Sequence, residues 1–198
     1  MSMFISGLFD CVKRKKGYFV ILILLSLLSI VLGVIAAINF GGGVFAVDLS
    51  NIAYIQFLKK ETGFMSMVIG LFLSLLVFFF VVIVCQCKTF LTPLGILFYL
   101  YLVYSQAVVF MSIILIYGIL KCIILVVLLL VYTLFVWGLF LLILCESCCF
   151  TNGQRYFKTC FSLKESRVLI YLTFLLALTF VFALILMVLR NYVVLLIF

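Results

Sequence analysis

The sequence predicts an all-α protein, a bundle of about five helices that span a membrane, and three observations lead to this prediction. Of the 198 residues, 70% are hydrophobic and 9% are charged, whereas about a quarter of the residues of soluble domains are charged. Between Phe64 and Cys145 the only formal charges are those of Lys88 and Lys121. Because about 20 helical residues cross a bilayer, this stretch holds roughly three spans. Its long apolar runs lack the alternation of barrel strands, and helices satisfy their own backbone polar groups in lipid.

The apolar runs divide into five expected spans within one integral membrane domain that takes in residues 1–198. These spans are residues 18–38, 64–84, 94–117, 122–144 and 168–189. Pro93 lies where the third span begins, and proline suits the first position of a helix. Gly118 and Lys121 are the weak markers between the third and fourth spans. Residues 89–145 as one helix would be about 85 Å long, so the chain must turn back near Gly118. The apolar end, residues 192–198, is too short to cross again and is expected to continue the last helix or to lie at the interface.

A short helix is expected in the first loop, between the first two spans. The run Gly41–Gly43 would let the chain leave the first helix, and Asp48 or Ser50 would cap the new helix. At helical spacing its apolar face consists of Ile52, Ile55 and Leu58. Since Gln56, Lys59 and Lys60 lie off this face, we expect an amphipathic helix that lies on the membrane.

Positive charge predicts the orientation of the bundle. One side of the five spans holds nine lysines and arginines and the other side holds four. The positive-inside rule then places the N-terminus in the cytoplasm and the C-terminus outside. A secretory signal peptide is the competing interpretation of the first span, but its apolar region of about 20 residues exceeds the usual 7–15. The net charge of +8 lies at segment ends, so we expect no nucleic-acid partner.

Two spans carry small residues four positions apart, a spacing that lets helix backbones approach closely. The first stripe is Ser29, Gly33 and Ala37, and the second is Ser66, Gly70 and Ser74. Near the middle of the third span, Gln106 is the clearest polar side chain, and polar groups at that depth usually bind a partner in the bundle. Tyr132, Thr133 and Trp137 of the fourth span are the candidate partners. The six stripe residues and Gln106 are the predicted helix-packing positions.

The sequence contains no set of side chains for catalysis. It has no histidine and five carboxylates, none of them within a span, so acid–base or metal-assisted chemistry lacks its usual residues. We therefore predict that the protein is not an enzyme.

The cysteines are the remaining candidates for a metal or a modification. Seven cysteines lie at or near the expected cytoplasmic face: Cys11, Cys85, Cys87, Cys145, Cys148, Cys149 and Cys160. That compartment is reducing, so structural disulfides are not expected. Zinc or iron–sulfur ligation and palmitoylation are alternatives to free thiols. Because the spacing of the cysteines is irregular, we predict free thiols, no metal and no cofactor.

The layout of the chain resembles a known family. It has a short basic N-terminus, a loop helix at residues 51–60, four further apolar segments with a polar loop before the last, and the run Tyr117–Lys121. This layout is similar to that of the stage II sporulation protein M family of Gram-positive endospore formers. The resemblance implies a multi-pass protein of the bacterial plasma membrane and a non-enzymatic scaffold of the cell envelope. Such a scaffold recruits peptidoglycan-degrading partners, the hydrolases that remodel the wall during engulfment of the forespore. No functional residue is carried over from the family.

Two other classes of function stay open beside this scaffold. One is a small membrane transporter or transporter subunit, which would show repeated half-structures or broken helices around a polar midplane. The other is a eukaryotic multi-span membrane organiser, which acylated juxtamembrane cysteines would support. In every case the lipid bilayer and other membrane or envelope proteins are the expected partners.

Overall fold

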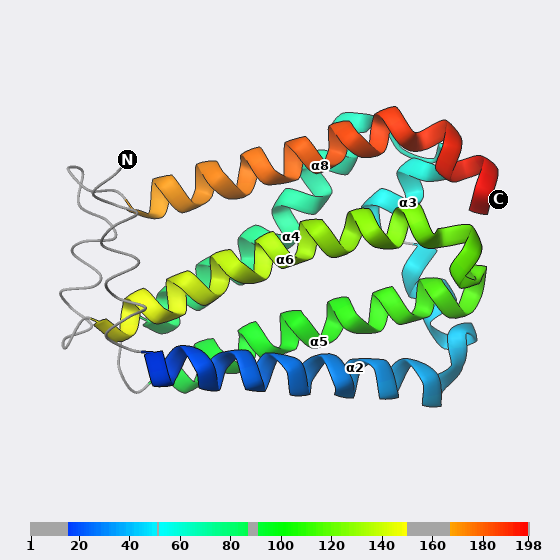
Figure 1. Cartoon of the computed structure of the whole chain (residues 1–198). Coiled ribbons are helices and arrows are strands. Elements are labelled where there is room, and N and C mark those ends of the chain that lie inside the picture. The colour runs from blue at the N-terminus through cyan, green and yellow to red at the C-terminus, as the bar shows by residue number, and fades with distance from the viewer. Residues whose placement is uncertain (1–15, 51, 87–90, 150–166, 198) are drawn as a thin grey trace.

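Five long helices run side by side in the computed structural model, and a short helix lies at one end (Figure 1). The structure describes residues 16–50, 52–86, 91–149 and 167–197, and the side chains of residues 16–39, 52–85, 91–145 and 169–194. The helices are α2 (Lys16–Ser50), α3 (Ala53–Leu58), α4 (Phe64–Gln86), α5 (Thr92–Tyr117), α6 (Ile119–Cys149) and α8 (Arg167–Ile197). These ranges contain no strand.

Within the described ranges, five helices are long and apolar enough to cross a membrane. Their apolar segments are Lys16–Asn39, Phe64–Cys85, Thr92–Tyr117, Ile119–Cys145 and Leu169–Val194. The predicted fold class, a helical bundle with five spans, is therefore confirmed. The chain is a multi-pass integral membrane protein whose apolar helices face the lipid.

Two residues set the ends of α5 as the sequence predicts. Pro93 lies in the first turn of α5, where a missing backbone N–H costs nothing. At the other end, Gly118 adopts a φ of 80°, and its N–H donates to the Ile114 carbonyl at 2.9 Å. Residues with a side chain rarely adopt this φ. The single residue Gly118 thus turns the chain from α5 into α6.

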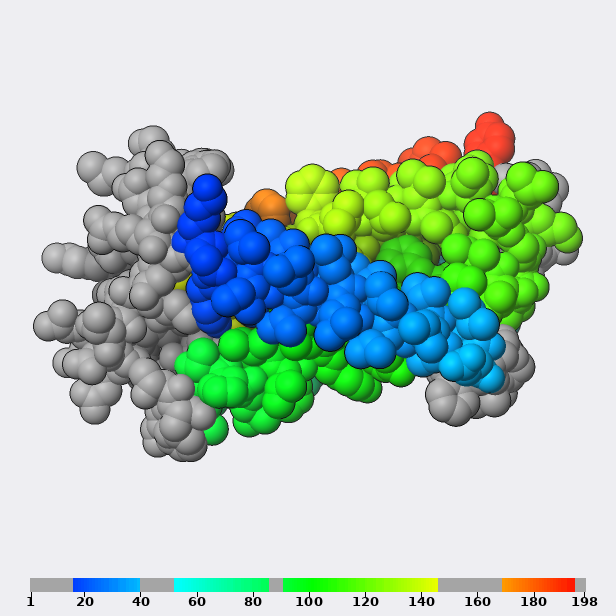
Figure 2. Space-filling view, turned by 60° about the horizontal axis from the view of Figure 1, so that its bottom comes forward, coloured from blue at the N-terminus to red at the C-terminus, as the bar shows by residue number. Residues whose placement is uncertain are grey.

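Helix α5 is the centre of the packing. It contacts α2, α4 and α6, while α8 contacts both α4 and α6. Helices α4, α5, α6 and α8 therefore form a closed ring, and α2 packs on the outside of α5. Figure 2 shows α2 lying along one face of the molecule, with α5 on one side of it and α6 on the other.

The first loop is shorter than the sequence predicts. Helix α2 continues through Gly41–Gly43 as far as Ser50, so the glycines do not end it, and Asp48 and Ser50 are residues of α2 instead of caps. Helix α3 begins after Ile52, which makes no side-chain capping bond. The low helix propensity of glycine costs only about 1 kcal/mol at each of the three positions, so the other residues of α2 keep the segment helical.

The loop helix is inside the bundle instead of on the membrane surface, which corrects the sequence-based expectation. In α3, Tyr54, Ile55, Phe57 and Leu58 are all buried, and α3 contacts α2, α4 and α8. The Arg190 guanidinium of α8 lies 4.4 Å from the centre of the Phe57 ring, a cation–π contact that holds α3 against α8. With both faces covered, α3 closes one end of the bundle, here called the α3 end.

Helices α2 and α5 approach each other closely at Gly33. A Cβ atom built on Gly33 would lie 2.8 Å from the Tyr104 carbonyl oxygen and 2.9 Å from the Ala107 Cβ. The first neighbour is backbone and cannot rotate away. In α6, by contrast, a Cβ on Gly138 would meet nothing within 4 Å.

We predict that Gly33→Ala destabilises the bundle by about 1–3 kcal/mol, because the added methyl forces α2 away from α5. Gly138→Ala is the matched control and should be neutral or slightly stabilising, since alanine favours helix. The midpoint of thermal unfolding in detergent micelles measures both changes. Equal midpoints for the two variants would contradict this packing.

Candidate functional site

One interhelical hydrogen bond joins α2 to α5. The hydroxyls of Ser26 and Tyr99 lie 2.9 Å apart, and both residues are buried. Ser26 donates its single proton to the Leu22 carbonyl at 2.7 Å. The Tyr99 hydroxyl is therefore the donor to the Ser26 oxygen, since a serine hydroxyl has one proton.

A second interhelical bond joins α5 to α6. The Trp137 Nε1–H donates to the amide oxygen of Gln106, so of the three candidate partners of Gln106 the structure selects Trp137. An indole N–H can only donate, which fixes the amide oxygen toward α6. The amide NH₂ of Gln106, with two donors, is then the group that this residue can offer to a ligand.

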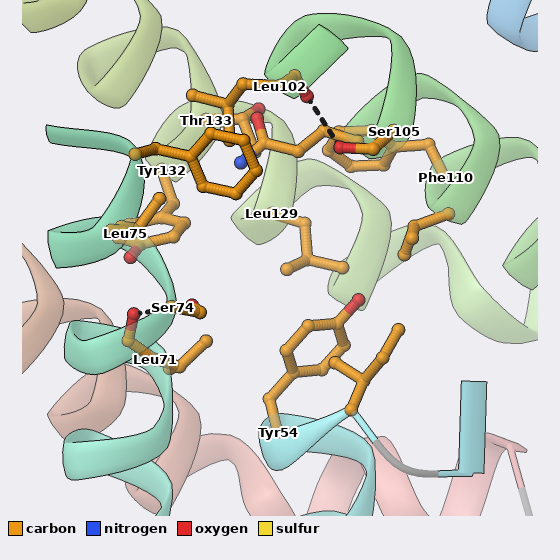
Figure 3. Close-up of a pocket in the computed structure, with 14 residues that line it drawn as sticks. Tyr54, Leu71, Ser74, Leu75, Leu102, Ser105, Phe110, Leu129, Tyr132 and Thr133 are labelled. Atoms are coloured by element: carbon orange, nitrogen blue, oxygen red, sulfur yellow. Dashed lines mark hydrogen bonds between the residues drawn. The ribbon is translucent and has the colours of Figure 1, made fainter. Parts of the chain in front are cut away.

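A cavity of about 230 Å³ lies between the middle parts of α4, α5 and α6 and is bounded by α3 (Figure 3). It is lined by Ile52, Tyr54, Leu71, Ser74, Leu75, Phe78, Leu102, Ser105, Gln106, Val109, Phe110, Leu129, Tyr132 and Thr133. None of these side chains carries a charge. Ser74 is exposed although it lines the cavity, so the cavity opens at the surface of α4.

Three of the lining hydroxyls are bonded to their own helix. Ser74, Ser105 and Thr133 donate to the carbonyls of Leu71, Leu102 and Leu130 at 2.8, 2.9 and 3.0 Å. Such bonds satisfy a hydroxyl within one helix and leave its oxygen able to accept.

The two lining tyrosines differ from these residues. In Figure 3 the Tyr54 hydroxyl points into the cavity from α3. The Tyr132 side chain is 6% exposed and stacks on Phe182 with ring centres 4.3 Å apart. Its buried hydroxyl has no hydrogen-bond partner in the described part of the chain. A buried hydroxyl without a partner costs about 1–3 kcal/mol, so this group calls for an explanation.

Burial raises the pKa of Tyr54 above its ordinary value, because the charged phenolate is poorly solvated there. Tyr54 therefore stays neutral at physiological pH and acts as a hydrogen-bond donor. Folding favours the protonated phenol of Tyr54. The free energy of folding that this side chain contributes is therefore fully present below about pH 10 and is lost as the pH rises further.

The structure separates the two small-residue stripes. Ser29, Gly33 and Ala37 are all buried, and Gly33 lies against α5. In the second stripe, Ser66 is exposed and a Cβ on Gly70 would lie 3.0 Å from the Cβ of Ala53 in α3. The third member, Ser74, lines the cavity. Within the second stripe, Gly70 therefore faces α3 and Ser74 faces the cavity.

The described cysteines form no cluster. Cys85, Cys122 and Cys145 are buried and are not in disulfides, and no three potential ligands among histidine, cysteine, aspartate and glutamate come together within the described residues. Residues Cys11, Cys87 and Cys160 lie outside the described ranges, as do the side chains of Cys148 and Cys149.

Sequence reasoning singled out the lining residues Ile52, Ser74, Gln106, Tyr132 and Thr133 for other roles and did not predict the cavity that they share. Tyr54 and Leu129 carry no signal, since they are ordinary members of apolar segments. A weak signal exists in Ser74, Ser105 and Thr133, which place hydroxyls near the middle of three different spans. The chain matches no protein-family model, no curated protein and no solved structure.

We predict that the Gln106–Trp137 bond contributes about 1 kcal/mol to stability, as interhelical bonds in membranes do. A double-mutant cycle with Gln106→Leu and Trp137→Phe measures it from unfolding free energies in micelles. The double variant should be more stable than the sum of the two single losses implies, because each single change leaves one partner unpaired. Strictly additive losses would show that the two residues do not interact.

Proposed function

We propose that this chain is a non-enzymatic membrane scaffold that recruits peptidoglycan-remodelling partners in the envelope of an endospore-forming bacterium. The proposal rests on the resemblance in layout to the stage II sporulation protein M family. Five apolar helices with a short helix between the first two support that layout.

The observation that carries the proposal is the turn that follows α3. Lys59, Lys60 and Glu61 are exposed there, whereas the apolar residues of α3 are buried in the bundle. Lys60 has a φ of 63°, so the turn is tight. A charged turn on a fixed helix is a rigid surface for a partner outside the membrane.

Two other places in the bundle are poor targets for a test of partner binding. Charges at Ile52 or Ile55 would disturb the α3 end of the bundle, since Ile55 is 2% exposed and a buried charge is costly. Leucine at Gly33 would act through the contact with α5. Neither change isolates partner binding from folding, so the exposed turn is the better target.

We expect Lys59→Glu with Lys60→Glu to lower co-purification of peptidoglycan hydrolases about tenfold, because the reversed charges repel an acidic partner surface. Affinity purification from native membranes with mass spectrometry measures the hydrolases. Lys121→Glu is the matched control and should have no effect. Lys121 is exposed in the first turn of α6, and α6 begins at the same end of the bundle as α3 (Figure 1). Full retention of every partner by the double variant would reject the turn as the recruiting surface.

The proposal also requires the α3 end to face the outside, as the nine-to-four distribution of basic residues indicates. Alkaline phosphatase fused after Phe198 should be active, and the same enzyme fused after Phe161 should be inactive. The reverse pattern, or activity at both positions, would overturn this orientation.

A further inference from the structure

We propose that the cavity between α4, α5 and α6 binds a neutral lipid with one uncharged oxygen group on an aliphatic chain, such as a long-chain alcohol or ester. This inference goes beyond the scaffold function and does not depend on it. It rests on the position of the cavity, its size and its unused hydrogen-bond donors.

The position of the cavity favours a ligand that comes from the bilayer. Ser74 lies near the middle of α4 (Phe64–Gln86) and is exposed, so the opening is at the level of the lipid chains. At the α3 end the cavity is bounded by Ile52 and Tyr54. A molecule dissolved in the membrane therefore reaches the cavity without crossing the interface.

The size of the cavity suits one chain. Its volume of about 230 Å³ exceeds the roughly 150 Å³ that holds a benzene molecule in an engineered cavity. It is below the roughly 300–1,000 Å³ of pockets for drug-sized ligands. Part of one aliphatic chain fits inside, and the remainder of the molecule stays in the bilayer beside α4.

The hydrogen-bond donors of the cavity favour a ligand that carries a hydrogen-bond acceptor. Two groups can donate to a ligand: the Tyr54 hydroxyl and the amide NH₂ of Gln106. The Tyr54 hydroxyl points into the cavity (Figure 3), whereas the Tyr132 hydroxyl is fully buried and cannot be reached from it. A hydroxyl or carbonyl oxygen on the ligand would satisfy these donors. That oxygen has few other partners among the lipid chains, so it gains by entering.

The absence of charge among the lining residues disfavours ionic ligands. All 14 lining residues are uncharged, and an ion at this depth would need a partner of opposite charge. A fatty acid anion or a phosphate group is therefore disfavoured, whereas an alcohol or an ester is not.

Photolabelling in phosphatidylcholine vesicles tests the proposal with the whole protein. The probe is a hexadecanol that carries a diazirine on its chain, and mass spectrometry identifies the labelled residues. We expect adducts on cavity residues, and unlabelled hexadecanol should compete about fivefold better than hexadecane, the value of one net hydrogen bond.

Two pairs of variants separate filling of the cavity from loss of its donors. Leu129→Trp fills the cavity and should abolish the cavity adducts. Leu130→Trp, at a neighbouring position that is 48% exposed, should leave them unchanged. Tyr54→Phe keeps the ring volume and should reduce the preference for hexadecanol over hexadecane, whereas Tyr132→Phe removes a hydroxyl that the cavity does not reach and should leave the preference unchanged. The phenylalanine variants keep the test valid if Leu129→Trp fails to fold, as judged by its unfolding midpoint.

The proposal is overturned if adducts fall only on lipid-facing residues such as Leu73 or Val77. Equal competition by hexadecane and hexadecanol would equally reject it, because the cavity would then take any chain. Unchanged labelling of a folded Leu129→Trp would place the bound probe elsewhere.

Discussion

The bundle depends on the contacts of α5, because apolar burial alone does not hold helices together in lipid. Lipid chains solvate leucine as well as a protein interior does, so close packing and interhelical hydrogen bonds supply the specificity. Helix α5 provides both. The backbone of α5 at Tyr104 packs closely against Gly33 of α2. Tyr99 forms a hydrogen bond with Ser26, and Gln106 forms one with Trp137. The two hydrogen bonds and the glycine contact join α5 to helices on two of its sides.

The sequence predicts the helical spans well because a membrane reduces the problem to one dimension. Length and hydropathy decide where a chain can cross, and Pro93 and Gly118 mark ends that backbone chemistry requires. The continuation of α8 to Ile197 is one of the two outcomes expected for the apolar end. None of these predictions needs knowledge of which helix lies beside which.

The errors arise where the partner of a segment decides its environment. The spacing of Ile52, Ile55 and Leu58 gives an apolar face, but spacing does not say whether that face meets lipid or protein. In the structure Tyr54 and Phe57 are buried too, so α3 is covered on more than one side. The two stripes show the same limit. Gly33 and Gly70 have equivalent sequence neighbourhoods, yet one lies against a span and the other against α3.

The cavity lies between two contacts of α4, one with α5 and one with α3. Away from the α3 end, the rings of Phe78 and Tyr101 stack with centres 6.2 Å apart and bring α4 and α5 together. At the α3 end, Gly70 lies against Ala53 of α3. Ser74 lies one helical turn from each contact, and its small side chain does not span the gap. A protein interior at normal density would fill such a space with side chains. A gap that opens to the bilayer can be filled by a lipid chain instead. A small residue such as Ser74 can therefore indicate a binding site as readily as a helix-packing face.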